Sequence, residues 1–84
     1  MTHFLKIYPE FFNDVKFGRK TFEVRKFDRN YKLGDVLVLK EFDGLNFSGR
    51  FVFVRVVYVL DNPSFCKEGY VILGIRLLKS FCKE

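Results

Sequence analysis

Residues 47–60 read FSGRFVFVRVVYVL, and this run of β-branched and aromatic residues predicts one long β-strand. The dipeptide Asp43-Gly44 precedes it and is a strong hairpin signal, so residues 36–42 are expected to form the strand before it. Val36–Leu39 and Val56–Leu60 are apolar at successive positions, which indicates that both faces of the sheet are covered there. An open sheet in so short a chain would leave one face in water. We therefore expect a sheet that curls on itself or is capped by a helix.

The flanking segments predict further strands and one short helix. Pro9 suits the first turn of a helix, the apolar residues after it recur at helical spacing, and Gly18 is suited to end the helix. The helix is therefore expected over residues 9–17. Three more strands are expected at residues 3–7, 20–26 and 70–78. These elements predict a single domain over residues 1–84. Its expected class is mainly β (α+β), a small, partly closed β-barrel of five to six strands with one short helix near the N-terminus.

The net charge of +5 is concentrated in one segment of the chain, residues 16–32. This segment holds seven basic and two acidic residues, which gives +5, whereas the rest of the chain holds eight of each sign. A local positive potential raises the concentration of anionic ligands near it. The segment therefore favours an anion-binding role over a merely solubilising face.

Nothing in the sequence indicates a membrane segment, a metal or a cofactor. The longest apolar run, Phe51–Leu60, is interrupted by Arg55 and is far shorter than the roughly 18 residues that cross a bilayer. The first residues lack the apolar stretch of a signal peptide, so a cytoplasmic location is expected. Cys66 and Cys82 match no common zinc spacing and are expected to be reduced thiols. His3 is expected to be a packed or surface residue rather than a proton-transfer group.

The strand predicted over residues 20–26 alternates between two faces. Phe22 and Val24 share one face and are expected to point into the core. Glu23 and Arg25 share the other, where the carboxylate can hold the planar guanidinium in one orientation. An oriented guanidinium can bind a phosphate or a base edge with two hydrogen bonds, and Lys20 can add a point charge. An ordinary surface salt bridge is the alternative interpretation of this pair.

The segment Gly18–Arg25 has the form Gly-x-Lys-x-x-Glu-x-Arg and resembles the signature of the ASCH domain, a branch of the PUA-like β-barrel superfamily. The resemblance runs over nearly the whole chain. Its other motifs lie at residues 3–12, 25–29, 33–37 and 68–75. Together they are similar to a compact subfamily of single-domain ASCH-like proteins of unknown function, common in phages and Gram-positive bacteria.

This resemblance implies a PUA-like barrel with a cleft beside the signature, and RNA or a modified nucleotide as the ligand. Combined with the charge distribution, it favours a module that binds RNA or a nucleotide. The residues expected to contact the ligand are Lys20, Glu23 and Arg25 of the signature, followed by Lys26, Arg29 and Lys32, whose charges suit phosphate. This interpretation includes no cofactor, no metal and no membrane.

Two alternatives stay open at this level. Some small ASCH-like proteins are amidohydrolases acting on acetylated cytidine, and they use a Lys, a Thr three residues later as nucleophile, and a distant Glu. Lys20 matches the lysine, but Glu23 stands where the Thr is expected, and a carboxylate cannot replace a hydroxyl as acyl acceptor without a change of mechanism. An enzyme acting on a modified nucleoside would instead use Lys20 and Glu23 to handle protons. The other alternative is a phage-related protein that binds a host protein through its basic face.

Overall fold

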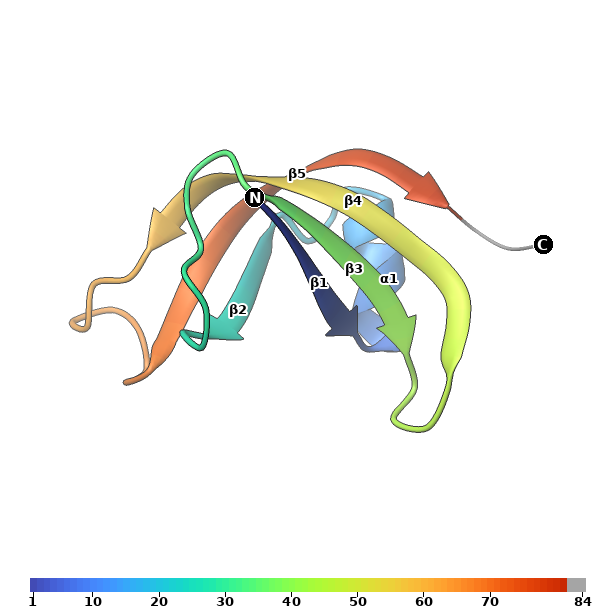
Figure 1. Ribbon diagram of the computed structural model, residues 1–84, viewed down its shortest axis with the longest axis horizontal. Helices are drawn as coiled ribbons and strands as arrows, with labels where there is room; N and C mark the ends of the chain where they lie inside the picture. The colour runs from blue at the N-terminus through green and yellow to red at the C-terminus, as the bar shows by residue number, and fades with distance from the viewer. Residues whose placement is uncertain (82–84) are drawn as a thin grey trace.

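The computed structural model describes residues 1–81, which form five strands and one helix (Figure 1). In chain order these are β1 (Thr2–Ile7), α1 (Pro9–Lys16), β2 (Phe22–Lys26), β3 (Val36–Phe42), β4 (Phe47–Leu60) and β5 (Tyr70–Phe81). All five strands join one sheet in the order β1-β3-β4-β5-β2, with β1 parallel to β3 and the other pairs antiparallel. The mainly β architecture with one short helix near the N-terminus is confirmed. β5 runs past the expected end at residue 78.

The sheet is curled into a half-barrel and does not close (Figure 1). Within residues 1–81, β1 pairs only with β3 and β2 only with β5, so these two strands are the edges of the sheet. The pairing of β4 with β5 shifts register twice, between Phe53 and Val54 and between Val56 and Tyr58. Such irregularities bend a strand and increase its twist, which accounts for the curl.

The hydrophobic core lies between the concave face of the sheet and α1. The helix buries Phe12 and Val15 in it. The central strands contribute alternate residues: Leu37 and Leu39 from β3, Val52, Val54 and Val56 from β4, and Val71, Leu73 and Ile75 from β5. Tyr31, from the long loop between β2 and β3, also lies in this core. The expectation of a sheet that curls on itself or is capped by a helix is therefore confirmed, since the sheet is curled and α1 packs against its concave face.

The turn at Asp43-Gly44 and the end of the helix at Gly18 both form as the sequence predicts. The carboxylate of Asp43 accepts hydrogen bonds from the backbone N–H groups of Leu45 at 2.8 Å and Asn46 at 2.7 Å, which closes the β3–β4 hairpin. Gly44 in this turn has φ 105°, a value that side chains with a Cβ rarely adopt. Gly18 likewise follows α1 with φ 78° and redirects the chain toward β2.

The two faces of β2 are the reverse of the expected ones. Phe22 and Val24 are 46% and 52% exposed, whereas Glu23 is only 4% exposed. The cause is the pairing with β5, in which Glu23 lies opposite Leu73 and Arg25 opposite Val71. Opposite residues of an antiparallel pair point to the same face, and Leu73 and Val71 face the core. The prediction that Phe22 and Val24 are core residues is therefore wrong, because the partner strand decides which face of an edge strand is turned inward.

α1, the one helix within residues 1–81, is too short to cross a membrane. Cys66 is a free thiol that donates a hydrogen bond to the carbonyl oxygen of Leu60 at 3.2 Å, and Cys82 lies outside the described residues.

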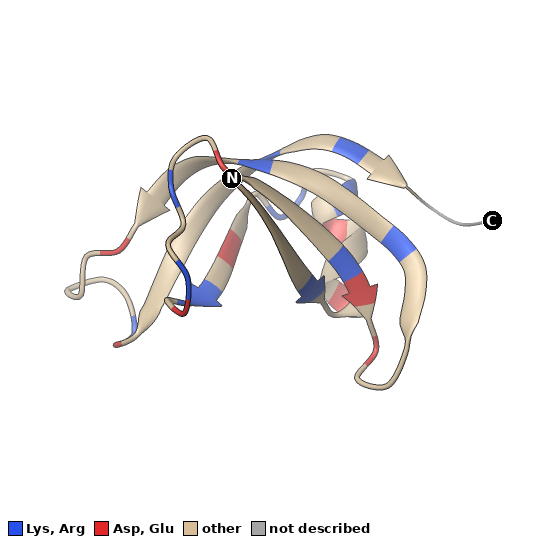
Figure 2. Cartoon of the chain, viewed as in Figure 1, with Lys and Arg blue, Asp and Glu red and all other residues tan. Residues whose placement is uncertain are grey.

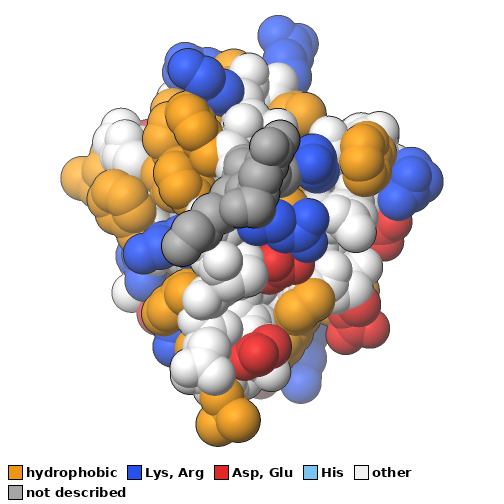
Figure 3. Space-filling model, turned by 90° about the vertical axis from the view of Figure 1, so that its right-hand side faces the viewer, with side chains coloured by type: hydrophobic (Ala, Val, Ile, Leu, Met, Phe, Trp, Pro, Cys, Tyr) orange, Lys and Arg blue, Asp and Glu red, His pale blue; other side chains and the backbone are white. Residues whose placement is uncertain are grey.

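On the side of the molecule that carries the end of β5, basic side chains are interspersed with acidic and hydrophobic ones (Figure 3). Positive charge is therefore not gathered into a single patch on this side.

Candidate functional site

A groove of about 420 Å³ lies on the open side of the half-barrel, between the end of β1 and the strand β2. Basic residues stand at the C-terminal ends of both strands, as Figure 2 shows. The start of α1 adds Tyr8 and Phe11 to the wall of the groove. The opposite wall consists of Lys20 and residues 22–25, which belong to the signature segment. The groove therefore exists because the sheet stops short of closing at β1 and β2.

Glu23, Lys20 and Arg25 form one ion-paired cluster in this groove. The Nζ of Lys20 donates to one carboxylate oxygen of Glu23 at 2.6 Å, and the Nε of Arg25 donates to the other at 3.0 Å. Lys20 also donates to the carbonyl oxygen of Phe22 at 2.7 Å. The Glu23 side chain is 5% exposed, while those of Lys20 and Arg25 are 18% and 21% exposed. The contact between Glu23 and Arg25 is therefore not a solvated surface salt bridge, because the buried carboxylate of Glu23 binds two cations that are themselves partly buried.

Arg25 also bridges the two edges of the sheet. Its Nη2 donates to the carbonyl oxygen of Lys6 on β1 at 2.7 Å and lies 2.9 Å from the Glu23 carboxylate. These contacts occupy Nε and Nη2, and the N–H groups of Nη1 have no hydrogen-bond partner in the described part of the chain. A guanidinium donates five hydrogen bonds in a fixed fork. Arg25 is therefore held in one orientation with donors left over for a ligand.

Aromatic side chains surround this cluster at the surface. Tyr8 is 58% exposed, and Phe11 and Phe22 are also exposed. The Nζ of Lys20 lies 5.5 Å from the ring centroid of Phe11 and 4.8 Å from that of Phe22, which are cation–π distances. Exposed rings beside oriented cations provide surfaces on which a planar ligand can stack. Phe22 is thus part of the groove and not of the core.

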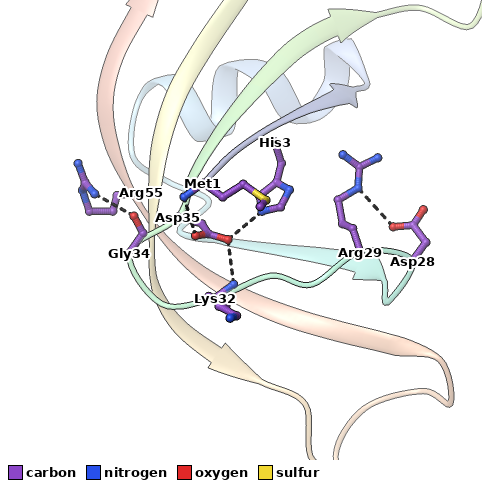
Figure 4. Close-up of polar contacts among 8 residues, drawn as sticks. All are labelled: Met1, His3, Asp28, Arg29, Lys32, Gly34, Asp35 and Arg55. Carbon is purple, nitrogen blue, oxygen red and sulfur yellow. Dashed lines mark hydrogen bonds and ion pairs between the residues drawn. The ribbon is translucent and has the colours of Figure 1, made fainter.

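The structure brings together only half of the residues predicted to contact the ligand. Lys20, Glu23 and Arg25 line the groove, whereas Lys26, Arg29 and Lys32 do not. Lys26 is the last residue of β2 and follows the stretch of the strand, residues 22–25, that lines the groove. Arg29 lies 3.5 Å from the carboxylate of Asp28 in the loop between β2 and β3 (Figure 4). These three residues are separated from the cluster because β2 ends and the chain turns away after Lys26.

Lys6 is the charged groove residue that the sequence analysis did not predict. It comes from β1, and its ammonium lies 4.4 Å from the ring centroid of Phe42 on β3. No carboxylate within residues 1–81 pairs with it. Lys6 lies outside the basic segment 16–32, and no local pattern links it to Arg25. Only the meeting of the two sheet edges reveals that it belongs to the groove.

A second buried carboxylate, Asp35, anchors the loop that follows β2 (Figure 4). It accepts hydrogen bonds from the backbone N–H of Lys32 at 3.0 Å and the N-terminal amine of Met1 at 3.1 Å, and it lies 2.8 Å from the Nε2 of His3. His3 is buried and packs on Tyr31 with ring centroids 4.9 Å apart. The expectation that His3 is a packed residue is confirmed, because its ring lies between an aspartate and an aromatic side chain.

Asp35 is expected to make the protein less stable in acid. Burial raises the pKa of this carboxyl, but the hydrogen bonds with His3, Lys32 and the N-terminal amine lower it to about 2, from an ordinary 3.8. A depressed pKa in the folded state stabilises the protein above the unfolded pKa, and this stabilisation is lost as the pH falls through the folded pKa. We expect the free energy of unfolding to fall by about 2 kcal/mol from this group between about pH 4 and about pH 2. Urea denaturation at each pH measures it.

The matched control for this prediction is Asp35→Asn, which removes the titrating group. The variant is expected to be less stable at neutral pH, because the contacts with Met1, His3 and Lys32 lose their charged acceptor. Its free energy of unfolding should change less with pH in the acid range than that of the wild type. An identical pH dependence in both proteins would show that other carboxylates are responsible.

Comparisons with known proteins assign the chain to a family. Residues 2–75 match the family described as Domain of unknown function (DUF3850). The chain belongs to the DUF3850 family. A relative of this DUF3850 chain, the "Uncharacterized 12.9 kDa protein in GpA 3'region" of Escherichia phage P2, is 41% identical to it over 71 residues. The match covers 84% of this chain and 64% of the phage protein, so the chain spans just under two thirds of that relative.

A solved structure has the same fold as this DUF3850 chain. The crystal structure of hypothetical protein PH0355 aligns with a TM-score of 0.64 and covers 93% of this chain and 100% of that one. The two sequences are 16% identical. At that identity the likeness shows the fold alone. The curled sheet with one helix is therefore an arrangement that a quite different sequence also adopts.

Proposed function

We propose that the groove between β1 and β2 binds a nucleotide or a short stretch of RNA. The observation that supports this most directly is Arg25, whose guanidinium is oriented by Glu23 and by the carbonyl of Lys6 while Nη1 is left without a partner in the described chain. Such a group binds a phosphate or the edge of a base with geometric specificity. Because the cluster is held before any ligand arrives, little ordering is needed on binding.

The charges and rings of the groove suit a ligand that is both anionic and planar. Three cations, Lys6, Lys20 and Arg25, accompany the single carboxylate of Glu23 among the lining residues. The cations favour a phosphate, and the exposed rings of Tyr8, Phe11 and Phe22 favour a base, which has a π-face whatever its identity. A ligand with only one of these two features would use half of the groove.

We also propose that the DUF3850 domain is related to ASCH domains of the PUA-like superfamily. The signature Gly18–Arg25 supports this, since its Lys, Glu and Arg form one cluster in a groove, as expected of a functional motif. The amidohydrolase alternative has less support. The position three residues after Lys20 holds the buried Glu23, and Thr21 is not one of the residues that line the groove. The groove thus favours binding over acyl transfer.

Substitution of Arg25 is expected to weaken nucleotide binding selectively. Arg25→Ala removes a charge-assisted hydrogen-bond contact from Nη1 worth about 1.5–3 kcal/mol, which corresponds to roughly 10- to 150-fold in affinity. Arg25→Lys should be almost as harmful, because an ammonium cannot reproduce the planar fork. Titration with nucleoside monophosphates and short single-stranded RNAs, followed by amide chemical shifts, measures the effect. The shifts should cluster at residues 6–11 and 20–25.

Arg76→Ala is the matched control, since Arg76 is an exposed arginine on β5 outside the groove. It should bind like the wild type. If Arg25→Lys also binds like the wild type, Arg25 supplies charge alone and the oriented contact is wrong. If no nucleotide or RNA shifts any groove resonance, the proposed function is wrong.

A further inference from the structure

A second hollow adjoins the groove and shares a wall with it. It has a volume of about 280 Å³ and is lined by Lys6, Ile7, Tyr8, Arg25 and Phe42. All of these except Phe42 also line the larger hollow of about 420 Å³. The two hollows therefore form one continuous depression along the end of β1, with Lys6 and Arg25 at the boundary between them.

The two hollows differ in chemistry. The larger contains the exposed rings of Phe11 and Phe22 and the carboxylate of Glu23, whereas neither Glu23 nor any other acidic residue lines the smaller. The smaller hollow is lined by two cations, Lys6 and Arg25, and by the side chains of Ile7, Tyr8 and Phe42. An anion is therefore favoured more in the smaller hollow, where no carboxylate offsets the two cations, than beside Glu23 in the larger.

We infer that the groove binds a nucleotide in two parts, with the base in the larger hollow and a phosphate in the smaller hollow, between Lys6 and Arg25. This inference rests on the proposed function and adds to it a phosphate-binding residue and a direction of binding. The phosphate can belong to a free nucleotide or to the backbone of an RNA strand, since both present the same anionic oxygens.

Lys6 is free to serve as the phosphate ligand. Its ammonium contacts the rings of Phe42 and Phe47, at 4.4 and 6.0 Å from their centroids, and no carboxylate of the described chain. An exposed cation–π contact is a weak interaction, and the long side chain can turn toward an anion beside it. Arg25 cannot turn in this way, because Glu23 and the carbonyl of Lys6 hold it. One fixed and one adjustable cation thus flank the smaller hollow.

The first arm of the test compares ligands on the wild-type protein. Adenosine, adenosine monophosphate, a dinucleoside monophosphate and inorganic phosphate are titrated separately. Adenosine monophosphate is expected to bind about tenfold more tightly than adenosine, because it adds charge-assisted hydrogen bonds to the same base contacts. Equal affinity for adenosine and adenosine monophosphate would overturn the inference while leaving base binding in place. If neither binds, the proposed function fails as well.

The dinucleoside monophosphate distinguishes the two sources of phosphate. If the dinucleoside monophosphate binds at least as tightly as adenosine monophosphate, the site suits a phosphate within a strand. If it binds less tightly, the site suits a free nucleotide. Both outcomes agree with the inference, provided that adenosine monophosphate binds more tightly than adenosine. Inorganic phosphate should displace adenosine monophosphate but leave bound adenosine in place, and displacement of adenosine would contradict separate hollows.

The second arm uses two lysines that lie side by side in the sheet. Lys6 on β1 pairs with Lys40 on β3, and both ammonium groups lie over aromatic rings of the same hairpin, but only Lys6 lines the hollows. Lys6→Ala should lower the affinity for adenosine monophosphate about tenfold and leave that for adenosine unchanged. Lys40→Ala should change neither. Equal losses for both ligands in Lys6→Ala, or equal effects of the two substitutions on adenosine monophosphate, would show that Lys6 does not bind the phosphate.

Discussion

Phe12→Ala is expected to lower the free energy of unfolding by about 3–5 kcal/mol. Phe12 is 0% exposed and is the largest fully buried side chain of α1. Its removal leaves a cavity between the helix and the concave face of the sheet, which has no other helix in residues 1–81 to fill it. A domain of this size has a total stability of about 4–12 kcal/mol, so the variant is expected to be marginally folded. Urea denaturation followed by circular dichroism measures the change.

The loss should lie toward the upper end of this range, because Phe12 also contacts a partly buried ion pair. The guanidinium of Arg50 lies 4.4 Å from the Phe12 ring centroid and pairs with the buried Glu41, with Nη2 at 2.6 Å. The hydrogen bonds from Arg50 hold the pKa of Glu41 below its ordinary value. Phe12 thus connects α1 to the β3–β4 hairpin as well as to the core.

Phe22→Ala is the matched control for Phe12→Ala. Phe22 is 46% exposed, so its loss should cost less than about 1 kcal/mol, while nucleotide binding weakens through the lost stacking surface. Comparable destabilisation by the two substitutions would contradict the orientation of β2 described above. Phe12→Leu keeps most of the buried volume and should recover much of the stability lost in Phe12→Ala.

The second large effect is expected from Glu23→Ala, at about 3 kcal/mol of destabilisation. Glu23 is buried and is the one carboxylate that pairs with Lys20 and Arg25 in the described chain. Its removal leaves two like charges, each partly buried, without a counter-charge. Deleting one partner of a buried ion pair leaves the other charge desolvated without a compensating attraction, and this lowers the free energy of unfolding.

This expectation differs from that for an exposed pair, which contributes only about 0–1 kcal/mol. Glu68→Ala, at an exposed glutamate in the loop before β5, is the control and should change the free energy of unfolding by less than about 0.5 kcal/mol. Arg25→Ala should be milder than Glu23→Ala, because Lys20 still neutralises the carboxylate. A Glu23→Ala variant as stable as Glu68→Ala would show that the cluster contributes to binding alone.

The sequence by itself predicted the elements of this fold. The strands over residues 36–42 and 47–60 have the bounds expected from their β-branched and aromatic residues. The turn at Asp43-Gly44 and the glycine that ends α1 were also predictable, because a side-chain acceptor and a positive φ are requirements of a few neighbouring residues. The curling of the sheet was predictable from the two runs that are apolar at successive positions, Val36–Leu39 and Val56–Leu60, because both faces of such strands must be covered. All of these properties depend on residues close together in the chain.

The signature Gly18–Arg25 was also recognisable in the sequence, and with it the pairing of Glu23 with Arg25. The inward direction of that pair was not, because the periodicity of a strand defines two faces without saying which is buried. The register of β2 on β5 decided it, by placing Glu23 opposite Leu73. Phe22 therefore became part of the groove wall, although its hydrophobicity indicated the core.

Only the tertiary structure decided which cations share the groove. Lys26, Arg29 and Lys32 are neighbours of Arg25 in sequence but lie elsewhere, while Lys6, nineteen residues away, supplies the carbonyl that holds the Arg25 guanidinium. Asp35 and His3, distant in sequence, likewise meet in a buried contact. The physical reason is the same in each case. A sheet whose edge strands come from separate parts of the chain assembles its open side from residues that no local pattern connects, and the curvature and register of all five strands determine which residues meet there.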